Sequence, residues 1–308
     1  MATWLLVLTA CTGSAVRSHP NPTGKGASAS VSPSGRDLPD FSHLVVVVME
    51  NHDFSQIIGN SQAPYINSLA HRYALATNYQ AVAHPSLPDY LALIGGSTFG
   101  IRSDCTDCPV SAPNLVDQLE ALGISWKAYM EDLPSPCFTG SASGQYAKKH
   151  DPFMYFDDIT SHPSRCRRVV PLTELKADLA GHALPRFAFI TPDLCHDMHD
   201  CGVEQGDRFL SKLLPPILAH LGPSGALFLT WDEGHPSVAT TPDTTCCPLA
   251  IGGHVVTIAA GPAARPGVTF GTPYNHYSLL RTIEDAWHLE PLGLTACSCI
   301  KPMTEMLQ

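Results

Sequence analysis

His43-Leu-Val-Val-Val-Val-Met49 is a continuous run of apolar residues, most of them β-branched. Such a run is typical of a strand that is buried on both faces of a parallel sheet. Three later runs have the same character, at residues 186–190, 226–230 and 255–260. Each ends in polar residues, glycine or proline, which we expect at the C-terminal edge of the sheet.

Segments with a helical pattern lie between these runs, at residues 113–122, 172–179, 207–221 and 276–287. Strands that alternate with helices predict an α/β fold, in which helices cover both faces of a mostly parallel central sheet as a three-layer α/β/α sandwich. The sequence contains no internal repeat and no second linker beyond residue 40. We therefore expect a single domain over residues 41–308.

The composition excludes several classes of protein. The chain has 308 residues, of which 44% are hydrophobic and 15% charged, so it is neither disordered nor fibrous. Asp and Glu number 28 against 18 Lys and Arg, which gives a formal charge of −10. A nucleic-acid binder carries a basic surface, and this chain has neither the charge nor a basic run. We expect no nucleic acid as a partner.

The N-terminus predicts export. Its apolar run, residues 4–10, is too short to span a bilayer, which takes about 20 apolar residues. Leu8-Thr-Ala-Cys11 is similar to a bacterial lipobox, in which Cys11 carries the lipid, and residues 1–11 are then a signal peptide. No Lys or Arg precedes the run, so a plain secretory signal or an unprocessed buried segment stays open. Residues 12–40 are rich in Ser, Gly, Pro and Ala, which predicts a flexible linker.

The cysteines also indicate a location outside the cytoplasm. Ten remain after Cys11, an even number that favours up to five disulfides in an extracytoplasmic protein, either secreted or anchored to the outer face of the membrane through Cys11. The competing interpretation is a zinc cluster, but Cys105-x-x-Cys108 has no second C-x-x-C at a suitable spacing. Cys297-Ser-Cys299 predicts a C-terminal end that is held by disulfides, with a loose redox pair as the weaker alternative.

Polar residues follow three of the predicted strands. These are Glu50-Asn51, Thr191-Pro-Asp193 and Trp231-Asp232-Glu233. Ligands in such sheets bind beyond the carboxyl ends of the strands, and crowded carboxylates are relieved by a cation. Any one of these residues alone is more often a helix cap or a solvated turn residue. Their occurrence at successive strand ends predicts a metal site, to which His199 and His276 can add nitrogen ligands.

Ser86 is the candidate nucleophile. It stands where a short polar turn runs into an apolar segment, at a predicted helix N-terminus, whose free N–H groups favour an alkoxide and an anionic substrate. The alternative is a simple N-cap serine followed by Pro88 in the first turn.

Six sequence blocks resemble the phosphoesterase family, which comprises acid phosphatases and non-haemolytic phospholipases C on an alkaline-phosphatase-like fold. The blocks occur in the family's order and cover nearly all of residues 41–288. They are VVVVMENHDF at 45–54, HPSLPDY at 84–90, YAKKHDP at 146–152, TPDLCHDMHD at 191–200, TWDEG at 230–234 and YNHYSLLR at 274–281.

The resemblance implies roles for individual residues. The implied metal ligands are Glu50, Asn51, Asp232 and Glu233, to which we add Asp193; the implied catalytic residues are Ser86, His199 and His276; and the residues expected to face the substrate are Asp89, Lys149 and His150. Two residues depart from the pattern, because Asp89 and Asp193 stand where the family commonly has Asn. A carboxylate cannot donate a hydrogen bond to phosphate unless it is protonated, so these positions can lower activity or change the metal number.

The expected reaction is hydrolysis of a phosphate ester through a phosphoseryl intermediate on Ser86, with a leaving-group proton from His196 or His276. Oxygen ligands favour Ca²⁺, Mg²⁺ or Mn²⁺, while the histidines keep Zn²⁺ and iron open. An acid-phosphatase-like monoesterase is the main prediction. Two alternatives are a phospholipase C-type phosphodiesterase and a non-catalytic surface lipoprotein that binds a phosphorylated ligand.

Overall fold

β1 (Leu44–Met49), the strand with which the sequence analysis began, lies inside a nine-stranded sheet and is buried along its whole length. A computed structural model describes residues 38–234 and 250–308, all within one unit of the chain, Arg36–Gln308. β1 pairs in parallel with β7 (Phe187–Thr191) on one side and with β8 (Ala226–Trp231) on the other. The three predicted strands that contain these segments are confirmed.

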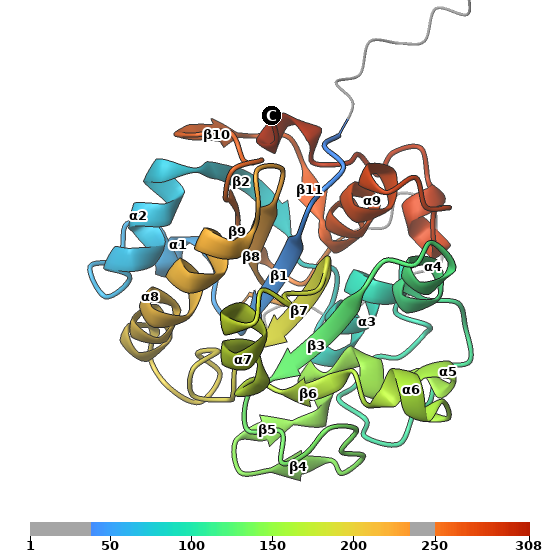
Figure 1. The fold of residues 1–308 in the computed structure, drawn as a ribbon. Helices are drawn as coiled ribbons and strands as arrows, with labels where there is room; N and C mark the ends of the chain where they lie inside the picture. The colour runs from blue at the N-terminus through green and yellow to red at the C-terminus, as the bar shows by residue number, and fades with distance from the viewer. Residues whose placement is uncertain (1–37, 235–249) are drawn as a thin grey trace, which may run out of the picture. The chain divides into compact units, whose positions relative to one another are not determined.

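The sheet has the order β10-β2-β9-β8-β1-β7-β3-β6, and β11 pairs with β2 (Figure 1). Sequence analysis missed several of its strands, because they are short or carry half-buried polar side chains instead of an apolar run. The missed strands are β2 (Ala74–Gln80), β3 (Trp126–Met130), β6 (Val169–Pro171), β10 (Val268–Phe270) and β11 (Tyr274–Asn275), besides a separate hairpin of β4 (Ala142–Ser143) and β5 (Tyr146–Ala147).

β9 (His254–Ala260) corrects one expectation. It runs antiparallel to both β8 and β2, with Ile258 opposite Leu229 and Leu75. Its C-terminal end therefore lies at the opposite edge of the sheet from the ends of β1, β7 and β8. An apolar run carries no information about strand direction, so the sequence could not show this. The consequence is that the start of β9 at His254, and Gly252 just before it, lie at the edge where the other strands end.

Helices cover both faces of the sheet, so the three-layer α/β/α arrangement is confirmed. Figure 1 shows α2, α7 and α8 on one side and α3, α4 and α9 on the other. The helices are α1 (Phe54–Ile57), α2 (Pro64–Arg72), α3 (Ser86–Gly95), α4 (Leu115–Ala121), α5 (Asp157–Thr160), α6 (Pro163–Cys166), α7 (Glu174–Ala180), α8 (Val203–His220) and α9 (His276–Ala286). The four predicted helices correspond to α4, α7, α8 and α9. Within the described residues, no helix has the length and apolar character needed to cross a membrane.

Disulfides join Cys105 to Cys108, Cys137 to Cys166 and Cys195 to Cys201. The zinc interpretation of Cys105 and Cys108 is therefore wrong, since their sulfurs are bonded to each other. Cys297 and Cys299 are also disulfide-bonded, so the C-terminal end is held as predicted. This pattern is typical of an extracytoplasmic protein. Cys246, Cys247 and the predicted signal, lipid-anchor and linker segment up to residue 37 lie outside the described residues.

Candidate active site

The ends of β1, β2 and β8 bring the predicted metal ligands and the candidate nucleophile together. Glu50 follows β1, Asp232 and Glu233 follow β8, and Ser86 begins α3 shortly after β2. The backbone N–H of Asp232 donates to the carbonyl of Met49 at 2.8 Å. The backbone N–H of Asn51 donates to Asp232 Oδ1 at 3.2 Å. Parallel pairing of β1 with β8 therefore places these acidic residues side by side.

Ser86 lies between two of these carboxylates. Its Oγ is 3.1 Å from Glu50 Oε2 and 3.3 Å from Glu233 Oε1, and the residue is only 1% exposed. Glu233 also contacts His84 through its other oxygen. Burial lowers the pKa of His84, but the hydrogen bond and charge of Glu233 outweigh it, so that pKa is raised overall. The Ser86 hydroxyl is thus held next to two groups that can accept its proton.

Glu50 is a centre of the hydrogen-bond network. The hydroxyl of Tyr90, on α3, donates to Glu50 Oε1 at 2.6 Å, and His150 Nε2 lies 3.1 Å from the same oxygen. Glu50 is fully buried. Burial and the nearby charge of Asp232 raise the pKa of Glu50 well above its ordinary value. The Tyr90 contact also ties α3, the helix that begins with Ser86, to the end of β1.

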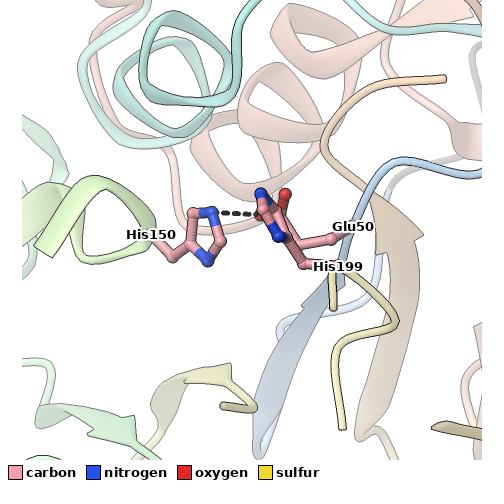
Figure 2. A group of neighbouring side chains, drawn as sticks. All are labelled: Glu50, His150 and His199. Atoms are coloured by element: carbon pink, nitrogen blue, oxygen red, sulfur yellow. Dashed lines mark ion pairs between the residues drawn. The ribbon is translucent and has the colours of Figure 1, made fainter. Parts of the chain in front are cut away.

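His150 and His199 both lie close to Glu50. Figure 2 shows the three side chains gathered together, with the His150–Glu50 contact dashed. One ligand atom from each of the three lies within 4.8 Å of the others. His150 Nδ1 is also 3.2 Å from Asp197 Oδ2. Burial, aided by the charge of Lys149, lowers the pKa of His150 well below its ordinary value, so the ring is a neutral ligand or hydrogen-bond partner.

Lys149 stands at the outer side of this group. Its Nζ is 3.0 Å from His199 Nε2, and it donates to Asp104 Oδ2 at 3.1 Å. His199 Nδ1 in turn lies 2.7 Å from Asp200 Oδ1. Lys149 and His199 keep about a fifth to a quarter of their side chains exposed, at 20% and 25%. These two side chains can therefore contact an anionic group that enters from solvent.

Asp89 and His276 lie next to the predicted metal ligands Asp232 and Glu233, and both are fully buried. Asp89 Oδ1 accepts from the backbone N–H groups of Val82 and Ala83 at 2.7 and 3.0 Å. His276 Nε2 donates to the carbonyl of Asp232 at 2.6 Å, and the Tyr79 hydroxyl lies 3.0 Å from its Nδ1. Burial lowers the pKa of His276 to about 4. Both side chains hold backbone segments in place.

Asp193 belongs to a second group, with Glu131 and His196. Its Oδ1 accepts from the backbone N–H groups of Cys195 and His196 at 3.0 and 2.8 Å, and its Oδ2 is 3.3 Å from His196 Nδ1. The His196 ring also contacts Glu131 at 3.0 Å and stacks on Phe209, with the ring centroids 4.4 Å apart. The predicted residues Asp193 and His196 therefore stabilise the loop after β7.

The residues around Glu50 fit a bound cation. Burial raises the pKa of Asp232 and Asp197 well above ordinary values, and the charge of neighbouring carboxylates adds to the effect. Asp232 Oδ2 is buried without a hydrogen-bond partner, and Asp197 Oδ2 is buried 3.2 Å from His150 Nδ1. Buried carboxylates with free oxygens are stabilised by a metal ion, which replaces the missing partners and offsets the mutual repulsion.

Sequence reasoning did not single out Tyr90, His84 or Asp197 as members of the site. Each lies in one of the quoted blocks, but none follows a predicted strand directly or stands at a helix start. Tyr90 is four residues after Ser86, and this helical spacing places the two on the same side of α3. That spacing is the one signal in the sequence by which the Tyr90 contact with Glu50 could have been found.

Comparison with known proteins identifies the family to which the chain belongs. The model of the phosphoesterase family matches residues 60–290. The chain is 34% identical over 272 residues to a phosphatidylinositol-3-phosphatase of Mycobacterium tuberculosis, covering 87% of this chain and 84% of that protein. It is 32% identical over 265 residues to a phosphate-repressible acid phosphatase of Penicillium chrysogenum, covering 83% of this chain but 61% of the relative.

The fold is similar to that of a solved alkaline phosphatase superfamily protein from Vibrio parahaemolyticus. The TM-score is 0.57 at 12% identity, with 86% of this chain and 71% of the other covered. At that identity the likeness concerns the fold alone, and it confirms the alkaline-phosphatase-like sheet. The length of the family match and the identity to the mycobacterial protein decide the family: this chain belongs to the phosphoesterase family and is a hydrolase of phosphate esters.

Proposed function

We propose that the chain is a metal-dependent phosphomonoesterase that uses Ser86 as its nucleophile. The observation that carries this proposal is the position of the Ser86 hydroxyl, 3.1 Å from Glu50 and 3.3 Å from Glu233 in a buried site. A serine hydroxyl is a weak nucleophile unless a neighbouring group takes its proton. Two carboxylates at hydrogen-bond distance supply that group. The names of its relatives, an acid phosphatase among them, support the same activity.

Glu50, Asn51, Asp232 and Glu233 would hold the metal ion. Their oxygens suit a hard divalent cation such as Ca²⁺, Mg²⁺ or Mn²⁺. The imidazole nitrogens of His150 and His199, beside Glu50, would suit Zn²⁺. When bound, the cation supplies positive charge that stabilises an anionic transition state. We leave Asp193 out of this set, because its carboxylate is engaged with His196 and two backbone N–H groups.

The chain's own residues can then carry two steps. Ser86 Oγ attacks phosphorus and loses its proton to a neighbouring carboxylate, while the bond from phosphorus to the ester oxygen breaks. The leaving alcohol takes a proton from a histidine, for which the partly exposed His199 is better placed than the fully buried His276. Water then attacks the phosphoseryl group, inorganic phosphate leaves, and the Ser86 hydroxyl is restored. Lys149 meets the charge of the phosphate oxygens.

The nucleophile assignment is tested with Ser86→Ala and a matched control, Ser68→Ala, on the exposed side of α2. We expect release of p-nitrophenol from p-nitrophenyl phosphate to fall by about a thousandfold or more in Ser86→Ala, since removal of a catalytic nucleophile has effects of this order. Ser68→Ala should match the wild type. Wild-type turnover by Ser86→Ala would disprove the assignment.

The same assay separates monoesters from diesters. We expect the wild type to prefer p-nitrophenyl phosphate over bis(p-nitrophenyl) phosphate in kcat/KM. A preference for the diester would instead indicate the phospholipase C-type activity, which uses the same residues around phosphorus. Turnover of neither ester by metal-loaded protein would favour the non-catalytic alternative.

The export of the protein is also part of the proposal. We place a signal peptide at residues 1–11, a flexible linker at 12–40 and the catalytic domain at 41–308, with Cys11 as a lipid-anchor site. The mass of the mature N-terminal peptide from expressing cells tests this. A diacylglycerol-modified Cys11 at the N-terminus is the expected result, and an unmodified N-terminus beyond Cys11 would show a plain secretory signal instead.

A further inference from the structure

Asp104 connects the nucleophile's helix to the lysine at the mouth of the site. Its Oδ1 accepts from the backbone N–H of Leu87, the residue after Ser86, at 3.1 Å. Its Oδ2 accepts from Lys149 Nζ at 3.1 Å. The same Nζ is 3.0 Å from His199 Nε2. One carboxylate therefore serves two donors that belong to different parts of the active site.

The loop that carries Asp104 is held in place by a disulfide and by a hydrogen bond from a lysine. Asp104 directly precedes the disulfide between Cys105 and Cys108. Inside that disulfide loop, the carbonyl of Thr106 accepts from Lys148 Nζ at 2.9 Å. The neighbouring lysines, Lys148 and Lys149, thus both reach back to this loop. The position of Asp104 is set by covalent and hydrogen-bonded links that do not involve the metal ligands.

The charges around Lys149 show what Asp104 does there. Lys149 feels the negative charges of Glu50 and Asp232 inside the site as well as that of Asp104 at its rim. With Asp104 in place, Lys149 Nζ stays beside His199, where it can contact an entering phosphate group. Without it, the inner carboxylates are the remaining acidic neighbours that attract the lysine. Asp104 therefore opposes a collapse of the ammonium group into the metal ligands.

We propose that Asp104 is a positioning residue of the active site, which holds Lys149 beside His199 and anchors the first turn of the helix that begins with Ser86. This inference rests on the proposed function, because it gives Lys149 its task in binding the phosphate group. Sequence analysis gave Asp104 no role.

Two substitutions remove the contacts of Asp104 to different extents. Asn has a single acceptor oxygen, so Asp104→Asn can serve Leu87 or Lys149 but not both, and Asp104→Ala serves neither. A charge-assisted hydrogen bond contributes about 1.5–3 kcal/mol, which corresponds to roughly a 10-fold to 100-fold change in rate. We expect kcat/KM for p-nitrophenyl phosphate to fall about 10-fold in Asp104→Asn and more in Asp104→Ala. Asp107→Asn, an exposed aspartate in the same disulfide loop, is the matched control and should stay within twofold.

A double-mutant cycle tests whether Asp104 acts through Lys149. In a Lys149→Met background, Asp104→Asn should lower kcat/KM by less than twofold, because the group that it positions is gone. The full 10-fold loss in that background would overturn the proposal, and so would equal activity of Asp104→Asn, Asp104→Ala and Asp107→Asn. Equal melting temperatures of Asp104→Asn and Asp107→Asn keep a folding defect from explaining the loss.

Amide hydrogen exchange gives a readout that needs no activity. Exchange in the peptide that contains Leu87 should be faster in Asp104→Ala than in the wild type or Asp107→Asn, since the N–H loses its acceptor. Unchanged exchange would contradict the anchor on α3. If Ser86→Ala proves fully active, the proposed function fails on its own, and this exchange experiment still decides whether Asp104 holds the first turn.

Discussion

At the scale of single residues, Asp89 shows how a departure from the family pattern is accommodated. Its Oδ1 accepts from the N–H groups of Val82 and Ala83, a task that the oxygen of an asparagine can perform equally well. Its Oδ2 is buried without a hydrogen-bond partner. Burial, followed by the charge of Glu233, raises the pKa of Asp89 well above its ordinary 3.8. The protonated form of Asp89 is therefore favoured in the folded protein.

Asp89→Asn should make the folded protein less sensitive to rising pH. A carboxyl group whose pKa is raised by folding stabilises the protein below its unfolded pKa, and this contribution is lost as the pH rises through the folded pKa. The variant lacks that loss, so we expect it to be more stable than the wild type at pH 8 by about 1–3 kcal/mol, the usual cost of an unsatisfied buried group. The difference should narrow toward pH 4. Melting temperatures at both pH values, with exposed Asp107→Asn as control, measure it; a difference that grows toward pH 4 would contradict the assignment.

At the scale of elements, the antiparallel strand β9 shapes the loop that leads to Ser86. The backbone N–H of Gly252 donates to the carbonyl of Ala81 at 2.9 Å, and the N–H of Ile251 donates to that of Val82 at 3.1 Å. A Cβ atom at Gly252 would lie 2.3 Å from the carbonyl oxygen of Ala83. Only a residue without a side chain allows the two segments to come this close. The reversal of β9 is therefore what places a second backbone segment against the loop that leads to Ser86.

Gly252→Ala should disturb this contact. The added methyl group meets backbone, which cannot rotate away, so we expect a loss of about 1–3 kcal/mol in the free energy of unfolding and a lower kcat from a displaced Ser86. Gly271→Ala is the control, because a Cβ there meets only Thr77 Oγ1 at an ordinary 3.9 Å. Urea unfolding and steady-state kinetics of both variants measure the effect. Equal behaviour of the two variants would show that the loop tolerates the methyl group.

At the scale of the whole molecule, part of the acidic excess of the chain is concentrated in one buried group. The sequence holds 28 acidic residues against 18 Lys and Arg, and several of the acidic ones are buried at one edge of the sheet. After burial itself, the charge of Asp232 raises the pKa of both Glu50 and Asp197, and the charge of Asp197 raises that of Glu50. Such a group destabilises the protein without a cation and stabilises it with one. The proposed cation site would therefore couple metal binding to folding.

Asp232→Asn should reverse its effect on stability when metal is added. In chelator at pH 8 the variant removes a buried repulsion, so it should melt above the wild type. At a hundredfold excess of cation over Kd the wild type gains about 2.7 kcal/mol, or roughly 5–10 °C, and should melt above the variant. Differential scanning calorimetry with Ca²⁺, Mg²⁺, Mn²⁺ and Zn²⁺ in turn measures this and identifies the metal. A wild-type Tm that none of these ions changes would disprove the metal site.

The sequence by itself determined which residues form the central strands, which acidic residues follow them, and which serine begins a helix, because burial patterns and helix starts are local properties. The blocks around Glu50, Ser86 and Asp232 also indicated the family. Only the tertiary structure decided the direction of β9, the separation of Asp193 and His196 from the Glu50 group, and the contacts of Tyr90, His84, Asp197 and Asp104. These depend on pairing between segments far apart in the chain, for which a single sequence carries no direction or distance.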